Sequence, residues 1–235
     1  MDRLLKDPRA WGLMMAAMLT IMSNATITPS LPGLEARFAD DPRAATLTRL
    51  LITAPSLLVA IVAPFAGSLT DRLGRRKPLL VGMVIYTVAG TAGLYLDSIE
   101  AILVSRLVLG LGVASIMTSQ AALVGDYFEG PARGRLMGYQ IAATNLGGLV
   151  FVSVAGVLAA QDARLPFAIY GLAGLLLTPR AEVFGKAPLY EFAFSALSAV
   201  ASRWARYLSV GNVTYFLLVL GDCLKARTCL LSLSL

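Results

Sequence analysis

Residues 67–77 read Gly-Ser-Leu-Thr-Asp-Arg-Leu-Gly-Arg-Arg-Lys and separate two long apolar runs. Gly74 permits a tight reversal of the chain, because glycine adopts backbone angles that other residues avoid. Asp71 is placed to receive an arginine or a helix N-terminus, and Gly67 allows a neighbouring helix to approach closely. Basic residues keep such a loop on one side of a membrane, and here they are Arg72, Arg75, Arg76 and Lys77. The stretch predicts a short charged turn between two spanning helices.

The composition of the whole chain indicates a membrane protein. Of its 235 residues, 57% are hydrophobic and 14% are charged, whereas about a quarter of the residues in a soluble domain are charged. So few polar residues cannot cover a soluble chain of this length, and lipid must solvate part of its surface. The net charge of +6 comes from residues that lie between the apolar runs. We therefore expect the lipid bilayer as a partner and no nucleic acid.

Six apolar runs reach the roughly 20 residues that a spanning helix needs. They are residues 10–28, 47–69, 78–96, 101–124 and 136–160, and a sixth run that begins near residue 165 and fades between 178 and 184. The first run stops at Pro29 and Pro32, and the second contains Pro55 and Pro64, which predict a bent, packed helix. A cleaved signal peptide is an alternative for the first run, but its length and the later runs favour a retained helix.

The loop charges predict the orientation of these helices, because short cytoplasmic loops are rich in Lys and Arg. Nine basic residues lie at one set of helix ends: Arg3, Lys6, Arg9, Arg72, Arg75, Arg76, Lys77, Arg133 and Arg135. Four lie at the opposite ends: Arg37, Arg43, Arg49 and Arg164. We expect a multi-pass protein of a bacterial-type inner (plasma) membrane, with both ends of the six-helix unit in the cytoplasm.

The stretch at residues 67–77 resembles the G-x-L-x-D-R-x-G-R-R loop of the major facilitator superfamily, and it lies where that family places the loop, after the second helix. A simple positive-inside anchor is the alternative. The resemblance covers about residues 11–179 and implies an all-α membrane fold, one six-helix half-bundle made of two three-helix repeats. It also implies a gating role for Gly67, Asp71, Arg72, Gly74, Arg75 and Arg76.

Two further stretches are similar to patterns of the same family. Arg106, Gly110 and Gly112 match the R-x-x-x-G-x-G pattern of the fourth helix. The resemblance implies that Arg106 couples to substrate or protons; snorkelling towards the interface is the alternative. Asp126 lies in the loop after that helix and, by resemblance, pairs with an arginine of the first motif, most plausibly Arg75. An exposed carboxylate of little energetic weight is the alternative there.

Polar stripes indicate where a solute could bind. Thr20, Asn24 and Thr28 recur every four residues in the first run, and Gln140, Thr144 and Gly148 do so in the fifth. Such groups turn away from lipid, and they either bridge helices or line a cavity. Asn24 is the best single candidate for a cavity residue, followed by Thr20, Gln140 and Thr144. Helices one, two, three and five contain no central carboxylate, which places proton coupling in doubt.

The sequence carries little of the chemistry that an enzyme needs. It contains no His, and its two cysteines, Cys223 and Cys229, are too few for a metal cluster or a disulfide framework. We find no nucleophile and base pair and no phosphate loop. We therefore expect no enzymatic activity, no metal site and no cofactor.

The 235 residues of the chain are enough for only one six-helix half, whereas the superfamily is normally built from two such halves. We expect residues 1–180 to be the N-terminal six-helix half and residues 181–235 an atypical tail, either one weak further helix or an out-of-frame segment. The predicted function is efflux of a small organic solute by alternating access, within a truncated or incomplete carrier. The alternatives are a non-transporting, degenerate membrane protein or helix-packing partner, and a half-size carrier that pairs with a copy of itself.

Overall fold

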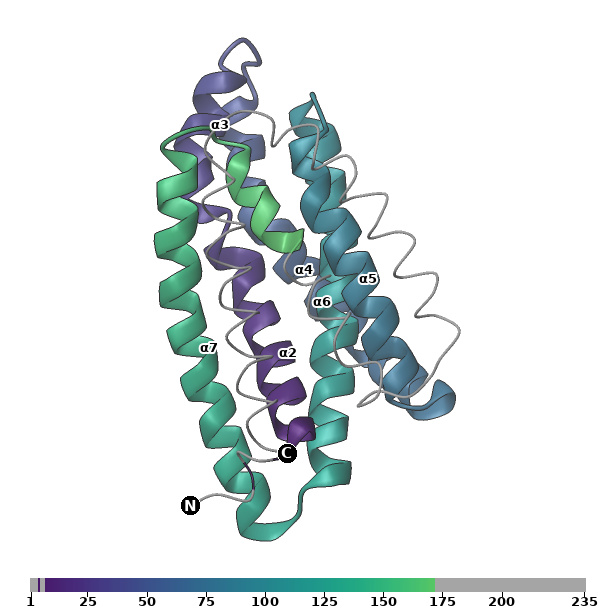
Figure 1. Ribbon diagram of the computed structural model, residues 1–235. Coiled ribbons are helices and arrows are strands. Elements are labelled where there is room, and N and C mark those ends of the chain that lie inside the picture. Colours follow the sequence, from purple (N-terminus) through teal and green to yellow (C-terminus); the bar gives the residue numbers. More distant parts are fainter. Residues whose placement is uncertain (1–3, 5–6, 172–235) are drawn as a thin grey trace. The chain divides into compact units, whose positions relative to one another are not determined.

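The apolar runs form helices that pack side by side in a computed structural model, of which residues 4 and 7–171 are described (Figure 1). This part of the chain contains helices and no strand. All of it belongs to the first of the chain's two units, Met1–Ala193. Five of its helical stretches are long and apolar enough to cross a membrane. The predicted all-α membrane fold is confirmed.

The first span divides into three helical pieces. Helix α2, Pro8–Ala25, starts at Asp7, whose carboxylate accepts the Arg9 amide. A 3-10 turn, η1, Thr28–Ser30, and the short helix α3, Leu31–Arg37, then follow. Helix α2 ends before Pro29, as expected, but the span continues to Arg37, because each proline lies in the first turn of a new piece. A proline is tolerated there since the amide it lacks would have no helical partner.

The second span, α4, Ala44–Leu73, remains helical through both of its internal prolines. Pro55 is buried, and its carbonyl oxygen lies beside Gly110 of a neighbouring helix, α6, Ile99–Tyr127. Helix α4 ends at Gly74, which has φ of +80°. This left-handed backbone angle explains why glycine is needed at the reversal.

Three more spans follow the turn at Gly74. Helix α5, Arg76–Thr91, continues into a 3-10 turn, η2, Ala92–Leu94. Helix α6, Ile99–Tyr127, begins at Ser98, whose hydroxyl accepts the Ala101 amide, and α7 is Gly130–Ala159. Helices α4 and α6 contain the predicted runs and extend them at both ends. Helix α5 with η2, and helix α7, begin before the predicted runs 78–96 and 136–160 and end at Leu94 and Ala159, just short of the predicted ends.

The predicted sixth span begins as a 3-10 helix, η3, Leu165–Tyr170. The rest of this run, the boundary at residue 180 and the tail at 181–235 lie outside the described residues. The sixth span and the division of the chain therefore stay predictions.

Helix α6 is central to the packing, since it lies against both α4 and α5, while α2 packs mainly against α7. Close contacts occur at glycines, as is usual between membrane helices. A Cβ at Gly82 of α5 would lie 2.8 Å from the Ser115 Cβ of α6, and one at Gly147 of α7 would lie 2.7 Å from Met18 of α2.

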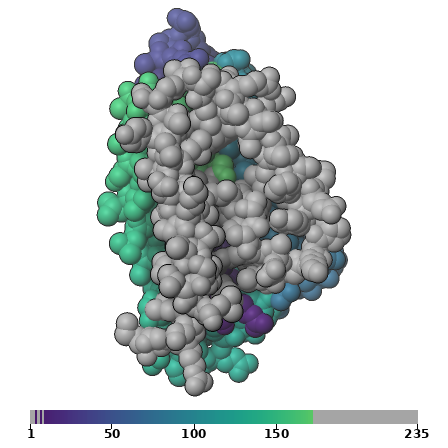
Figure 2. Space-filling view, in the orientation of Figure 1, coloured from purple at the N-terminus to yellow at the C-terminus, as the bar shows by residue number. Residues whose placement is uncertain are grey.

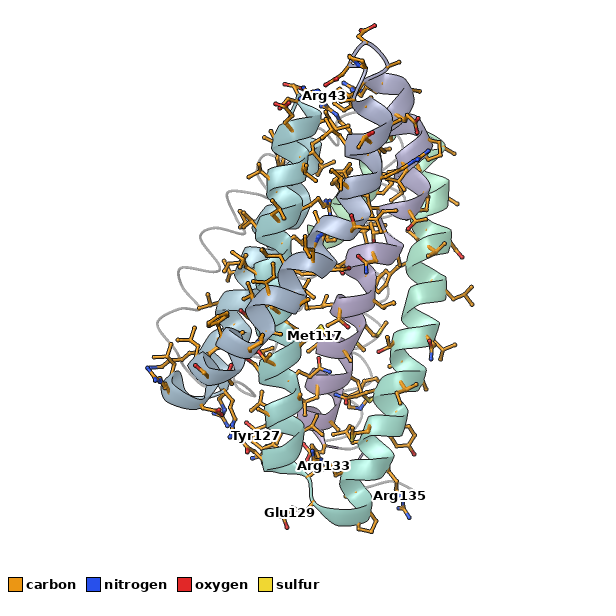
Figure 3. The ribbon with its side chains drawn as sticks, turned by 180° about the vertical axis from the view of Figure 1, so that it is seen from behind. Arg43, Met117, Tyr127, Glu129, Arg133 and Arg135 are labelled. Carbon is orange, nitrogen blue, oxygen red and sulfur yellow. The ribbon has the colours of Figure 1, made fainter. Side chains whose placement is uncertain are left out.

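The two ends of the bundle differ in their side chains (Figure 3). Arg43 lies at one end, and Tyr127, Glu129, Arg133 and Arg135 lie at the other. We call the second end the motif end, because it also holds the α4 to α5 turn of residues 67–77. The end with Arg43 is called the opposite end below.

Candidate functional site

The end of α4 and the turn after it place four charged side chains at the motif end: Asp71, Arg72, Arg75 and Arg76. Gly74 reverses the chain, so that Arg75 and Arg76 begin α5 directly after α4 has ended. Asp71, one turn earlier on α4, lies 3.7 Å from the Arg75 guanidinium. Arg72 and Arg76 are exposed. The turn thus presents Arg75 between its own helix and the end of α6.

Arg75 and Asp126 form the main ion pair of this site. The Arg75 Nη1 lies 2.8 Å from each Asp126 carboxylate oxygen, and the side chains are 32% and 44% exposed. A doubly hydrogen-bonded, partly buried pair is stronger than a fully solvated one. The pair expected from the sequence is therefore present, and it joins the α4 to α5 turn to the end of α6.

Two residues that the sequence analysis did not assign extend this contact to α2. The Arg76 Nε donates to the Tyr127 hydroxyl at 3.1 Å, and the Arg9 guanidinium lies 5.2 Å from the centre of the Tyr127 ring. A cation over an aromatic face is attracted to it. Tyr127 directly follows Asp126 in the sequence, but no spacing rule indicated that Arg9 would reach it.

Gly67 does not have the role that the sequence suggested within the described residues. A Cβ at this position would meet no atom within 4 Å. The expectation of a close helix approach at Gly67 is therefore wrong for this part of the chain. The glycine lies on a side of α4 to which none of the described helices packs closely.

Arg106 is fully buried in the N-terminal half of α6, between aromatic rings. Its guanidinium carbon lies 4.6 Å from the ring centres of both Phe167 and Tyr170, and its Nη2 lies 3.5 Å from the Gly90 carbonyl oxygen. Nε and Nη1 have no hydrogen-bond acceptor among the described residues. Arg106 is held inside the bundle and is not exposed, which disfavours the snorkelling alternative.

Gly110 and Gly112, predicted with Arg106 as a coupling motif, lie at helix contacts. A Cβ at Gly110 would approach the Pro55 carbonyl oxygen of α4 to 2.8 Å, and one at Gly112 would approach the Gly82 carbonyl oxygen of α5 to the same distance. Two glycines separated by one residue therefore allow α6 to pack closely on two sides. Their observed role is helix packing.

The residues of the polar stripes of α2 and α7 differ in their contacts. Gln140 is buried and donates to the Leu13 carbonyl oxygen at 3.3 Å, so its amide bridges the helices. The Thr20 hydroxyl donates to the Ala17 carbonyl oxygen of its own helix. Asn24 differs, because its Oδ1 is buried and has no partner among the described residues. Thr144 is half-buried on α7, one turn after Gln140.

Ion pairs also tie the opposite end. Arg43 Nη2 lies 2.9 Å from Glu100, and Arg164 Nη2 lies 3.0 Å from Asp97. The pKa of the Asp41 carboxyl is lowered, chiefly because it accepts the Arg43 backbone amide. Of these residues, Arg43 and Arg164 contributed to the predicted topology, and no contact was predicted for them.

No group of three metal-ligating side chains occurs within residues 4 and 7–171. The five apolar helices, and a charged turn that pairs with the end of α6, are features of a multi-pass membrane transporter. The chain belongs to the Major Facilitator Superfamily, whose family model matches residues 13–189.

Two relatives share part of this sequence. Quinolone resistance protein NorA of Staphylococcus aureus is 26% identical over 127 residues, which cover 54% of this chain and 33% of that protein. Multidrug resistance protein 1 of Bacillus subtilis (strain 168) is 31% identical over 107 residues, which cover 46% of this chain and 28% of that protein. The matched part is therefore no more than about a third of either relative's length.

Proposed function

We propose that this chain supplies one half of a carrier that moves small amphiphilic organic solutes out of the cell by alternating access. Transport is the general activity of the superfamily to which the chain belongs. The printed names of the two relatives, quinolone resistance and multidrug resistance, support a drug-like solute for this chain as well. The single observation that carries the mechanism is the Arg75 and Asp126 pair.

This pair is suited to a gate because it joins the first three-helix repeat to the second at the motif end. It connects the α4 to α5 turn with the end of α6, and it is partly solvated. A pair of moderate strength forms in one state and opens in another without a large barrier, because water replaces each partner at little cost. The six-helix unit then rocks against a second unit around a site near the middle of the bilayer.

The surfaces of α4 and α7 support the need for a second unit. In the most apolar stretch of each span, only 11% of α7 and 22% of α4 is buried inside the described structure. The corresponding share is 50–61% in the other three spans. Figure 2 shows α7 at the surface along much of its length. The exposed side of α7 carries large apolar residues, such as Ile141 and Leu149, together with a row of small or polar ones: Gly134, Gly138, Asn145, Ser153 and Gly156. A Cβ at any of these three glycines would meet open space. Small and polar residues in such a row are typical of membrane helix contacts.

Reconstitution into liposomes tests the transport proposal. The probe is a fluorescent quinolone, chosen from the name of one relative. We expect flux above that of empty liposomes, reduced by Asp126→Asn and unchanged by Glu129→Gln, a matched exposed carboxylate of the next loop. Absence of flux at every protein density would support the non-transporting alternative, and equal loss in both variants would contradict the gate.

The occupant of the α7 surface is tested separately. In a chain with Cys223→Ser and Cys229→Ser, we introduce Gly138→Cys on the open side of α7. Disulfide-linked dimers in membranes would support pairing with a second copy, and Met83→Cys, at a buried position, is the control that should not link. Monomer alone would refute the half-size dimer and leave a separate second half as the partner.

We also propose that the motif end faces the cytoplasm of a bacterial inner membrane, in agreement with the excess of basic residues there. A membrane-impermeant maleimide added to whole cells should label Glu100→Cys at the opposite end and leave Glu129→Cys unlabelled until the cells are broken. The reverse pattern would invert the topology.

A further inference from the structure

The short 3-10 helix η3 places three side chains in a row. A 3-10 helix has three residues per turn, so Arg164 at its start, Phe167 and Tyr170 lie above one another on one face. The figure of the ribbon shows this segment, green, running from the end of α7 towards α5 and α6 (Figure 1). The three side chains of this row face residues near the end of α5.

Each member of the row meets a partner near the end of α5. Arg164 pairs with Asp97, and the ring of Phe167 occupies the space where Gly93 would carry a side chain. A Cβ at Gly90 would lie 2.6 Å from Tyr170. Gly90 and Gly93 therefore leave the room that the two rings need, and any larger residue would displace them.

Arg106 enters this contact from α6. Its guanidinium lies against both rings and beside the Gly90 carbonyl oxygen, and it is completely buried. A buried cation needs compensating negative potential, and the faces of aromatic rings supply it. Among the described residues, no carboxylate pairs with Arg106. The two rings are therefore its main electrostatic partners in this part of the chain.

Two tyrosine hydroxyls connect the same cluster to α2. Tyr170 donates to the Ser23 carbonyl oxygen at 2.7 Å, and Tyr86 of α5 donates to the Leu19 carbonyl oxygen at 2.8 Å. The two rings contact each other, with centres 5.6 Å apart. Helices α2 and α5 belong to the first three-helix repeat, whereas α6 and η3 belong to the second. The cluster therefore bridges the repeats.

We propose that residues 164–170 form a clasp that fastens the second repeat to α2 and α5, and that Arg106 is the positioning residue that holds it. Arg106 acts through Phe167 and Tyr170 and does not contact the solute. Its consequence for transport rests on the proposed function. A six-helix unit whose two repeats are fastened by the clasp moves as one body near the opposite end.

The clasp is tested by crosslinking in the full chain, with Cys223→Ser and Cys229→Ser. Asp97→Cys and Arg164→Cys replace the outermost contact by a reporter pair, so that the two rings and Arg106 are left to hold the segment. A short bis-maleimide bridges the two thiols, and intact-mass spectrometry separates one bridging reagent from two single additions. The matched control pair is Arg43→Cys with Glu100→Cys, a similar ion pair at the same end, formed between other segments.

We expect Arg106→Met, which keeps the length of the side chain without its charge, to lower bridging between positions 97 and 164 by about five-fold or more. Bridging between positions 43 and 100 should not change. Arg106→Lys should restore part of the bridging, because it returns the cation. Phe167→Leu should act as Arg106→Met does, and the two together should add little, since both remove the same contact.

Unchanged bridging in Arg106→Met and in Phe167→Leu would overturn the clasp. So would an equal loss at both cysteine pairs, which indicates general loosening, or a failure of Arg106→Lys to restore any bridging. If Arg106→Met is not recovered from membranes, Phe167→Leu alone carries the same prediction. The measurement uses no solute, so the clasp and the transport proposal fail independently.

Discussion

The Arg75 and Asp126 pair allows a quantitative prediction. Surface ion pairs contribute about 0.2–1 kcal/mol. This pair should reach the upper end of that range, because Asp126 receives two contacts of 2.8 Å and neither side chain is more than 44% exposed. We expect a coupling free energy of about 1 kcal/mol, or about 2–4 °C in the unfolding midpoint of a chain of this size.

A double-mutant cycle measures this coupling free energy directly. The variants are Arg75→Gln, Asp126→Asn and the two together, and thermal unfolding in detergent is followed by size-exclusion chromatography. Raising the salt from about 0.1 M to about 1 M shortens the screening length from about 10 Å to about 3 Å and should weaken the coupling. The matched control is Arg43 and Glu100, whose side chains are 66% and 62% exposed. A coupling for Arg75 and Asp126 that does not exceed that of the control would refute the reasoning.

Three further predictions concern single positions. Gly110→Ala should destabilise the fold by about 1–3 kcal/mol, because its Cβ meets the backbone of α4. Gly138→Ala, where the Cβ meets nothing, is the control and should be neutral or slightly stabilising. Equal unfolding midpoints of these two variants would contradict the packing role of Gly110. Gly74→Ala should cost about 1–3 kcal/mol, because φ of +80° with ψ of 153° is a backbone region that residues other than glycine rarely adopt. Gly67→Ala, in ordinary helix geometry with open space, should be neutral or slightly stabilising, as Gly138→Ala should be. Tyr86→Phe should cost about 1–2 kcal/mol, because the buried hydroxyl of Tyr86 donates to α2. Tyr139→Phe, at a half-buried position on α7, is the control. If Tyr86→Phe lowers the unfolding midpoint no more than Tyr139→Phe does, the Tyr86 bond does not stabilise the fold.

Local patterns predicted the spans and the charged turn well. A spanning helix is encoded by its own apolar residues, so the runs around residues 47–69 and 101–124 could be located without knowledge of their neighbours. Gly74 and the pair of Arg75 with Asp126 followed from a motif with fixed spacing, and the structure contains both features.

Contacts between distant segments were less predictable. From the sequence alone, Gln140 could either bridge two helices or line a cavity, because a buried glutamine suits both roles. In the same way, Gly110 could serve either helix packing or coupling, because glycine occurs in both. Pro29 and Pro32 were interpreted as stops, since a proline in the first turn of a helix looks the same in sequence as one that ends it. The contact of Phe167 with Gly93 depends on the 3-10 geometry of η3, for which the apolar run gave no sign.

The hydrogen bonding of the polar residues in α2 has a consequence for how such residues are interpreted in transporters. A hydroxyl such as that of Thr20 donates to a carbonyl of its own helix, so it is satisfied in lipid without any cavity. The Asn24 amide oxygen can only accept, and every amide hydrogen in the middle of a helix is already used. No described residue donates to this oxygen, so a donor from a neighbouring helix or from a bound molecule would satisfy it. Among Thr20, Asn24 and Thr28, only the Asn24 side chain therefore selects for a neighbouring group that carries a hydrogen-bond donor.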